Sequence, residues 1–302
     1  MRIPSASGMY MAVREWDRYQ NKSSANSYAM DILRRWSRIE LNKIYNEDNI
    51  TFIKRIPDDF VDLTVTSPPY DNLRDYKGYT FDFETLAKEV YRVTKPGGVV
   101  VWVVGDATVN GSETGTSFRQ ALKFMDIGFN LHDTMIYEKN KVHVYDPRQH
   151  RYKSSSEYMF VFSKDKPKTF NAIKDIKNKT PGKKVKVSQR LNNGSIRSDR
   201  EIIHKEYQAR GNVWKYVTGN ENSFAYEHPA VFPLQLAKDH IISWSNKGDL
   251  VFDPFMGSGT TAIAALDAER CFIGAEIAKE YVDIANERIK HHTTQTELFD
   301  FI

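Results

Sequence analysis

The chain has 302 residues and a net charge of +4, and 40% of its residues are hydrophobic, enough for one large domain or for one domain with an insertion. Its longest apolar run, Val99–Val104, is far shorter than the roughly 20 residues of a membrane-spanning helix, and residues 1–20 hold no apolar block typical of a secretory signal. The single cysteine, Cys271, cannot form an internal disulfide, so we expect a reducing, cytoplasmic location.

The N-terminal part of the chain is polar before it becomes periodic. Residues 1–26 are irregular and predict a flexible N-terminal arm. The spacing of Ile32, Trp36 and Ile39 is typical of a helix that runs from about residue 27 to residue 46.

Two strands are expected next. Ile50–Ile53 is short and apolar, whereas Phe60–Thr66 is β-branched and typical of a strand buried on both faces. The second strand runs into the tetrapeptide Ser67-Pro68-Pro69-Tyr70, whose two prolines end the strand and stiffen the loop. Ligands of open α/β sheets bind at this carboxyl edge of the strands.

Helices and strands then alternate up to residue 138, and one further strand is expected near residue 160. Apolar positions on one face predict the helices, and continuous apolar runs predict buried strands. The expected elements are a helix over Phe83–Val93, a break at Lys95–Gly98, a strand over Val99–Val104, a helix from an N-cap at Ser117 to about Gly128, and strands over Leu131–Glu138 and Tyr158–Ser163.

Residues 139–225 lose this alternation and are basic. Within them, residues 164–215 contain 15 Lys/Arg and 5 Asp/Glu, a net charge of +10, which leaves −6 for the rest of the chain. Such a segment either faces a polyanion such as DNA or is a solvated lysine-rich loop.

A strand, a glycine turn and a helix near the C-terminus organise the whole chain. The run Leu250–Phe252 predicts a strand that Asp253 and Pro254 end, and Gly257 and Gly259 then permit a tight turn without Cβ clashes. An alanine-rich helix follows from Thr260 or the next residue, as in nucleotide-binding turns. The glycine pattern alone is a weak signal, because it also fits a dinucleotide dehydrogenase or an ordinary strand-to-helix turn.

Glu276 strengthens the prediction of a nucleotide site. It follows an expected strand, Cys271–Ala275, about 20 positions after the glycines, where an acidic side chain suits a ribose hydroxyl. Because only residues 277–302 come afterwards, the other strands of a doubly wound sheet must precede the glycine turn. An expected helix over Leu234–Trp244 precedes the strand and the turn. We therefore predict an α/β fold with a circularly permuted, Rossmann-like sheet.

The tetrapeptide carries the most specific chemistry. The exocyclic amino group of a base is a poor nucleophile, because its lone pair is delocalised into the ring. The hydroxyl of Ser67 and a carbonyl of Pro68 or Pro69 supply acceptors that hold its hydrogens and orient the lone pair. Tyr70 offers a face on which a flipped base can stack. The alternative is an ordinary proline turn, and the presence of the glycine turn in the same chain argues against it.

Together, the segments Thr66–Tyr70 and Asp253–Gly259 resemble the amino-group DNA methyltransferases that use S-adenosylmethionine. The order, with the catalytic tetrapeptide first and the cofactor turn last, is similar to their β class. The resemblance covers about residues 45–292. It implies a catalytic half at 27–138, a target-recognition region at 139–225, a cofactor-binding half at 226–292 and a tail at 293–302, after the arm at 1–26.

The resemblance also implies residue roles. Ser67, Pro68, Pro69 and Tyr70 would form the catalytic loop. The residues implied to bind S-adenosylmethionine are Asp253, Pro254, Phe255, Gly257, Gly259 and Thr260 around the methionine part, Glu276 at the ribose, Asp48 near the adenine, and Phe232 in the segment before the cofactor loop. The substrate would be double-stranded DNA, in a bacterial or phage-type restriction-modification setting, and a homodimer rests on the resemblance alone.

Which base is methylated depends on Ser67. N4-cytosine members of the family often carry serine where adenine-specific members carry aspartate, so N4 of cytosine is favoured and N6 of adenine is the alternative. Methylation of cytosine C5 needs a cysteine nucleophile in the catalytic loop, and Cys271 lies far from Ser67 in the chain. No metal-ligand spacing is present, so no metal is expected.

Two interpretations from other classes compete. One is methylation of RNA or of a protein amide, against which the permuted order and the long basic insertion argue. The other is a non-catalytic DNA-binding module, against which the intact Ser67, Gly257 and Glu276 argue. Finally, Gln295–Phe299 resembles the short peptides that dock on bacterial sliding clamps, although such pentapeptides also arise by chance.

Overall fold

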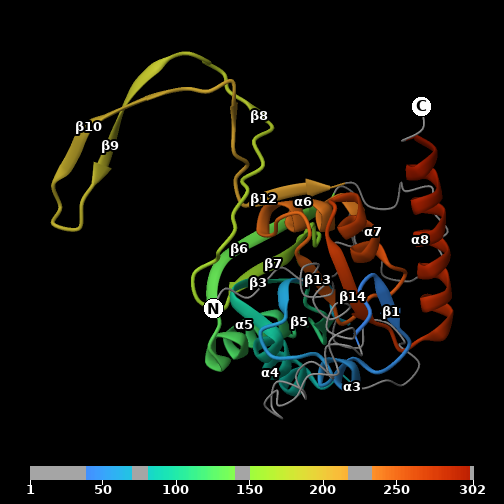
Figure 1. The fold of residues 1–302 in the computed structure, drawn as a ribbon. Coiled ribbons are helices and arrows are strands. Elements are labelled where there is room, and N and C mark those ends of the chain that lie inside the picture. The colour runs from blue at the N-terminus through green and yellow to red at the C-terminus, as the bar shows by residue number, and fades with distance from the viewer. Residues whose placement is uncertain (1–38, 70–80, 140–149, 217–232, 300–302) are drawn as a thin grey trace, which may run out of the picture.

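The computed structural model describes residues 39–69, 81–139, 150–216 and 233–299. At its centre lies an eight-stranded sheet of order β1-β14-β13-β2-β3-β7-β6-β12 (Figure 1). All neighbours run parallel except β7, which is antiparallel to both β3 and β6. In sheet order the strands are Lys43–Tyr45, Cys271–Ala275, Leu250–Asp253, Val61–Thr66, Thr94–Val104, Ser156–Ser163, Asn130–Lys139 and Val213–Tyr216.

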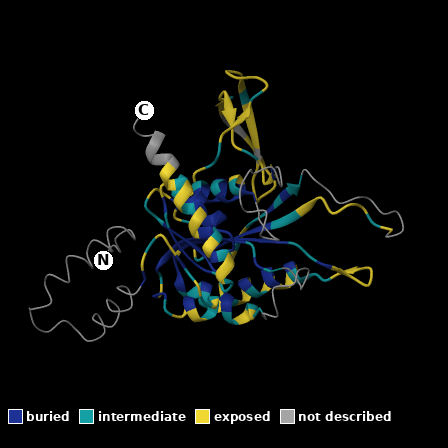
Figure 2. Ribbon diagram, turned by 90° about the vertical axis from the view of Figure 1, so that its right-hand side faces the viewer, coloured by how far each residue is buried: buried dark blue, intermediate teal, exposed yellow. Residues whose placement is uncertain are grey.

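Helices cover both faces of the sheet, so it is doubly wound. One core joins the sheet to α3 through Phe52, to α4 through Val90 and to α5 through Phe124. The other core joins the opposite face to α6, α7 and α8, and Figure 2 shows the strands buried between the two layers. The helices are α3 Asn49–Ile53, α4 Phe83–Val93, α5 Thr116–Ile127, α6 Leu234–Trp244, α7 Thr260–Asp267 and α8 Lys279–Phe299.

The strand order confirms the predicted permutation. β13 and β14 come from the C-terminal end of the chain, yet they lie between β1 and β2. α4 and α6 have the predicted bounds. β3, in contrast, begins earlier than expected, at Thr94, because Lys95 pairs with the buried Asp62 of β2 at 2.7 Å and continues the strand.

Three local predictions are wrong. Ile50–Ile53 lies in helix α3 because Asp48 accepts a hydrogen bond from the backbone N–H of Thr51 at 2.9 Å and so caps a helix. The helix expected over residues 27–46 does not reach its end, since Lys43–Tyr45 is strand β1; its part before residue 39 lies outside the described residues. Ser117 lies inside α5, whose N-cap is Gly115.

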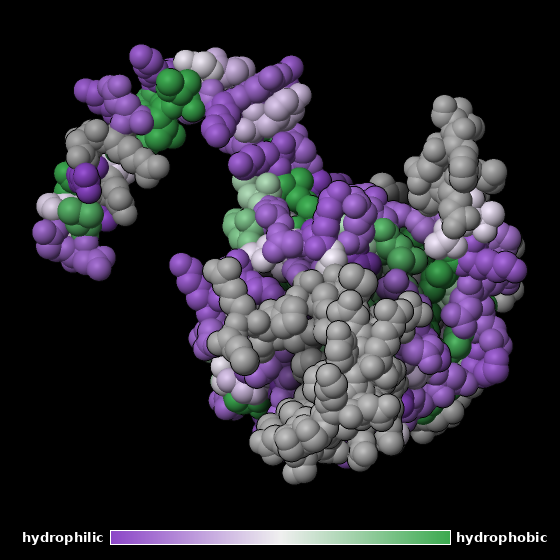
Figure 3. Space-filling view, in the orientation of Figure 1, coloured by the Kyte–Doolittle hydropathy of each residue, from purple (hydrophilic) through white to green (hydrophobic). Residues whose placement is uncertain are grey.

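A long extension, residues 174–209, leaves the body after β7 and returns just before β12. β8 (Ile176–Lys177) pairs with β11 (Tyr207–Gln208), and further out β9 (Lys184–Arg190) pairs with β10 (Ile196–Ile203) as an antiparallel ribbon. Figure 1 shows the ribbon projecting from the sheet, and Figure 3 shows mostly hydrophilic side chains along it. A smaller hairpin joins β4 (Thr108–Val109) to β5 (Ser112–Glu113).

The region predicted for target recognition, 139–225, therefore contains two kinds of structure. The extension is an outlying ribbon, whereas Ser156–Ser163 and Val213–Tyr216 are strands β7 and β12, which pair with β6 in the main sheet. Within the described ranges, no helix has the length and apolar character needed to cross a membrane.

Candidate active site

The predicted site residues meet at one edge of the sheet. β13 lies between β2 and β14 and is parallel to both, so the carboxyl ends of the three strands are neighbours. Ser67 follows β2, Asp253 ends β13 and Glu276 follows β14. Pro68 is buried, whereas Ser67 and Pro69 are partly exposed. Tyr70, the fourth residue of the predicted catalytic loop, lies outside the described residues.

Asp253 is a buried carboxylate that joins two of these strand ends. Its Oδ1 accepts hydrogen bonds from the hydroxyl of Thr66 at 2.6 Å and from the N–H of Phe255 at 2.9 Å. Its Oδ2 accepts from the hydroxyl of Thr261 at 2.6 Å. Burial raises the pKa of Asp253 to about 6, and the hydrogen bonds from Thr261 and Thr66 oppose that rise.

The glycine turn lies between β13 and α7. Gly257 and Gly259 have φ angles of +51° and +84°, in the region that favours glycine. A Cβ on Gly259 would lie only 2.9 Å from the Cβ of Ala285, so the turn packs directly against α8. From the same helix, Arg288 donates to the carbonyl and the hydroxyl of Ser258. The buried Thr260 begins α7, as one of the two predicted starts has it.

Glu276 holds the other side of the turn. Its Oε2 accepts from the N–H of Gly257 at 3.0 Å, and its Oε1 accepts from the N–H of Ala278 at 2.9 Å. Burial raises the pKa of Glu276, and these N–H groups act in the opposite direction. Because a carboxylate oxygen can accept more than one hydrogen bond, both oxygens keep acceptor capacity, as a pair of ribose hydroxyls requires.

The remaining predicted cofactor residues differ in how far the structure describes them. Asp48 is exposed just after β1, the neighbour of β14, and caps α3. Pro254 is buried, and the partly buried Phe255 makes an edge contact with Phe81 at a centroid distance of 5.1 Å. Phe232 lies outside the described residues.

Sequence reasoning missed several residues that shape this edge. Thr66 and Thr261 bind Asp253, and Asn46 donates from its side chain to the carbonyls of Glu276 and Ile277, at 3.0 Å each. The only available signal was position, since Thr66 directly precedes the tetrapeptide. In the described ranges, His, Cys, Asp and Glu side chains form no group able to hold a metal ion.

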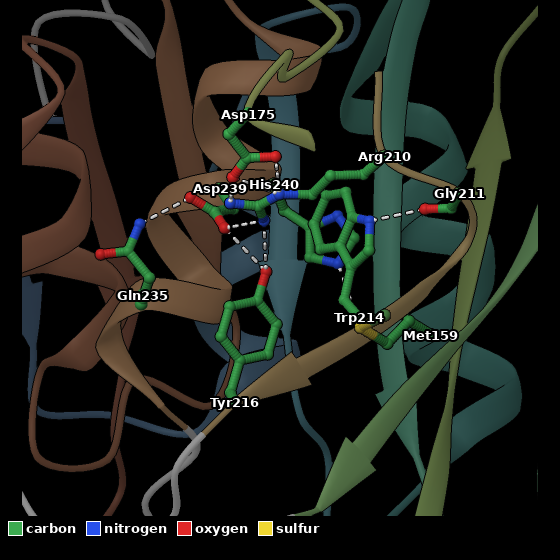
Figure 4. A network of polar contacts seen from close by, with 9 residues as sticks. All are labelled: Met159, Asp175, Arg210, Gly211, Trp214, Tyr216, Gln235, Asp239 and His240. Carbon is green, nitrogen blue, oxygen red and sulfur yellow. Dashed lines mark hydrogen bonds and ion pairs between the residues drawn. The ribbon is translucent and has the colours of Figure 1, made fainter. Parts of the chain in front are cut away.

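A second polar network joins the base of the extension to the body (Figure 4). The guanidinium of Arg210 binds Asp175 across the base, with Nε at 2.9 Å from each carboxylate oxygen, and also binds Asp239 of α6 at 2.5 Å. Asp239 further accepts from Tyr216 of β12 at 2.8 Å and from Gln235 at 2.6 Å. Hydrogen bonding to Asp175 raises the pKa of Arg210, so the cation persists at every accessible pH.

Known proteins resemble this chain over most of its length. A family model described as DNA methylase matches residues 61–287. The orphan methyltransferase M.BamHII of Bacillus amyloliquefaciens is 55% identical over 79% of this chain and 92% of its own length. The type II methyltransferase M.BglII of Bacillus subtilis is 30% identical over 81% of this chain and 68% of its own length.

Solved structures give the same result for the fold. A complex of M1.HpyAVI with S-adenosylmethionine superposes with a TM-score of 0.56 at 25% identity, and covers 82% of this chain and 98% of that one. The cytosine-N4-specific PvuII DNA methyltransferase superposes with a TM-score of 0.59 at 22% identity, and covers 81% of this chain and 84% of that one.

Proposed function

Since this chain belongs to the N6/N4 family of S-adenosylmethionine-dependent DNA methyltransferases, we propose that it methylates the exocyclic amino group of a base flipped out of duplex DNA, and that this group is N4 of cytosine. Its relatives include type II methyltransferases, the modifying enzymes of restriction-modification systems. One observation carries the choice of base, namely Ser67 at the tetrapeptide position where adenine-specific members carry aspartate. N6 of adenine is the competing target.

The proposed mechanism rests on orientation. The Ser67 hydroxyl oxygen and the carbonyl oxygen of Pro68 accept the two hydrogens of the amino group, and this turns the nitrogen lone pair toward the methyl carbon. S-Adenosylmethionine, when bound, supplies the methyl group. Two consecutive prolines keep the acceptors in place, and the ring of Tyr70 stacks on the flipped base. No covalent intermediate with the enzyme forms.

The same edge supports the proposed cofactor residues. The carboxylate of Glu276 has acceptor capacity for the ribose hydroxyls, and Asp48 follows the adjacent strand, on the adenine side. The turn at Gly257 and Gly259 lets a ligand approach the backbone closely. Asp253, whose carboxylate already accepts bonds from Thr66, Thr261 and Phe255, acts by shaping this turn.

We also propose that the extension contacts the DNA. The ribbon carries exposed Lys184, Lys186 and Arg190 on β9, and a two-stranded ribbon fits the major groove. Cationic side chains give affinity for phosphates, whereas the amides of Asn192 and Asn193 at the ribbon tip can read base edges. Target recognition by residues 139–225 is thereby assigned mainly to residues 174–209.

One experiment tests the reaction and the base together. The protein is incubated with S-adenosylmethionine and unmodified genomic DNA, the DNA is digested, and its nucleosides are identified by mass spectrometry. Ser67→Ala protein, purified in parallel, controls for contaminating methyltransferases. N4-methylcytosine supports the proposal, and N6-methyladenine overturns the choice of base. Neither product, with S-adenosylmethionine binding intact, would contradict DNA methylation altogether.

A further inference from the structure

We infer that Thr66 and Asp253 form a positioning bridge, which holds the catalytic loop at a set position relative to the cofactor turn. The inference rests on the proposed function, because it assumes that Ser67 orients the amino group. It assigns to Thr66 a role in turnover without contact with either substrate. It also makes Asp253 a link between two parts of the site rather than a direct ligand of the cofactor.

The residues of the bridge are buried away from solvent. Thr66, Asp253 and Thr261 are 0%, 1% and 1% exposed, so water does not compete for their hydrogen bonds. The carboxylate of Asp253 receives one hydroxyl at each oxygen, both at 2.6 Å. The Thr261 hydroxyl oxygen also lies 3.5 Å from the carbonyl oxygen of Val65, one residue before Thr66.

The bridge connects the strand that precedes the catalytic loop to the strand that precedes the cofactor turn. Thr66 is the last residue of β2, and its neighbour Ser67 begins the catalytic loop. Asp253 is the last residue of β13, and its Oδ1 also holds the N–H of Phe255 in the cofactor turn. The backbone ladder between β2 and β13 pairs only Leu63 and Thr64 with Val251 and Phe252. Beyond that ladder, the Thr66–Asp253 hydrogen bond continues the connection between the strands.

Thr64 provides an internal contrast. It lies two positions before Thr66 on β2, on the same face of the sheet, and it is equally buried at 0% exposure. Among the described residues, however, its hydroxyl has no hydrogen-bond partner. The two threonines therefore differ in the bridge and not in burial, strand or side-chain shape.

The experiment compares Thr66→Val with Thr64→Val, because valine keeps the shape of threonine and removes only the hydroxyl. For Thr66→Val we expect kcat to fall about 10- to 100-fold, since small misplacements of reacting groups have effects of this size. The Kd for S-adenosylmethionine, measured by calorimetry, should change by less than about threefold, which corresponds to a change in binding free energy of less than about 0.7 kcal/mol. Thr64→Val should match the wild type in both quantities.

A second pair of variants covers the case in which Thr66→Val does not fold. Thr66→Ser and Thr66→Ala both lack the methyl group and differ only in the hydroxyl, so the bridge predicts that serine rescues kcat and alanine does not. Equal kcat values for the serine and alanine variants, or an unchanged kcat in Thr66→Val, would overturn the bridge. Ser67→Ala is measured alongside. If Ser67→Ala leaves turnover intact, the proposed catalytic loop is wrong. If Ser67→Ala loses turnover and Thr66→Val does not, only the bridge is wrong.

Discussion

The carboxyl edge of the sheet and the extension differ in how far their side chains are buried and hydrogen-bonded. At the edge, Thr66 and Asp253 are buried and hydrogen-bonded, so the geometry is set before any ligand arrives. In the ribbon, even large apolar side chains face solvent, as Ile203 does at 60% exposure. The difference agrees with the roles proposed above, in which methyl transfer uses preorganised acceptors and the ribbon keeps its side chains free to adapt to DNA.

The largest expected effect comes from breaking the preorganised edge. Valine at Gly257, where φ is +51°, strains the turn that is proposed to bind the cofactor. We expect Gly257→Val to weaken S-adenosylmethionine binding about 100-fold or more in calorimetry. Gly211→Ala is the control, because its φ is ordinary and nothing lies within 4 Å of the added Cβ. Binding by Gly257→Val at wild-type affinity would contradict the assignment of the turn.

The next largest effect is on the free energy of unfolding, and it comes from the burial of the Asp253 carboxylate at the edge of the sheet. Because the folded-state pKa of Asp253 is raised to about 6 from 3.8, its contribution to stability is fully present below pH 4 and is lost as the pH rises through 6. The loss is about 3 kcal/mol at the usual conversion of pKa shift to energy. Asp253→Asn removes this ionisation, and it also removes the charge that helps to raise the pKa of Glu276, the acid that follows the neighbouring strand, so both changes act in the same direction.

Urea unfolding at pH 4.5 and pH 7.5 checks this sign. Relative to Asp253→Asn, the wild type should lose stability at the higher pH. A difference between the two proteins that does not vary with pH would mean that the Asp253 carboxyl titrates at its ordinary pKa.

The same contrast explains what could be predicted from the sequence. Buried strands and amphipathic helices leave periodic apolar patterns, so Phe83–Val93 and Leu234–Trp244 were placed correctly. Val213–Tyr216 was missed as a strand because it is short and lies within a basic segment. Ile50–Ile53 was assigned wrongly because one capping side chain, Asp48, decided between strand and helix.

For the site, the strand ends were predictable and their connections were not. Prolines after β2 and glycines after β13 mark the two loops in the sequence. The bond between Thr66 and Asp253 joins residues 187 positions apart, and only the strand order brings them together.

A moderate effect is expected from loosening the extension at its base. Arg210→Ala removes the cation between Asp175 and Asp239, so the extension loses its side-chain attachment to α6. We expect the KM for DNA to rise about 10-fold, or about 1.4 kcal/mol, with kcat at saturating DNA unchanged. Lys215→Ala, which breaks only the exposed pair with Glu138, should change neither value. A fall in kcat alone would place Arg210 in the catalytic site instead.

A smaller and salt-dependent effect is expected in the ribbon. Replacing Lys184, Lys186 and Arg190 by alanine should lower the slope of log K for DNA against log salt by about 0.9 for each phosphate that the protein no longer neutralises. Fluorescence anisotropy with a labelled duplex at several salt concentrations measures this slope. Lys247→Ala removes an exposed charge just before β13, at the opposite edge of the sheet from the site, and should leave the slope unchanged. A slope unaltered in the triple variant would show that the ribbon lies off the DNA.

The smallest effect on turnover is expected at the C-terminal end of α8. Deletion of residues 295–302 should leave methyl transfer unchanged, because the contacts of Arg288 with the glycine turn remain. If Gln295–Phe299 is a docking peptide, binding of the full chain to a purified bacterial sliding clamp, measured by surface plasmon resonance, is lost in the shortened protein. If the shortened protein binds the clamp as the full chain does, Gln295–Phe299 is not a docking peptide.

The two ends of the extension meet where the backbone N–H of Arg210 donates to the carbonyl of Ile173 at 3.1 Å. A loop whose ends are adjacent can be lengthened, shortened or exchanged without moving the strands on either side. Residues 174–209 thus form a cassette within the enzyme. If residues 174–209 recognise the target as proposed, exchanging this cassette changes the recognised sequence and leaves the buried edge of the sheet unaltered.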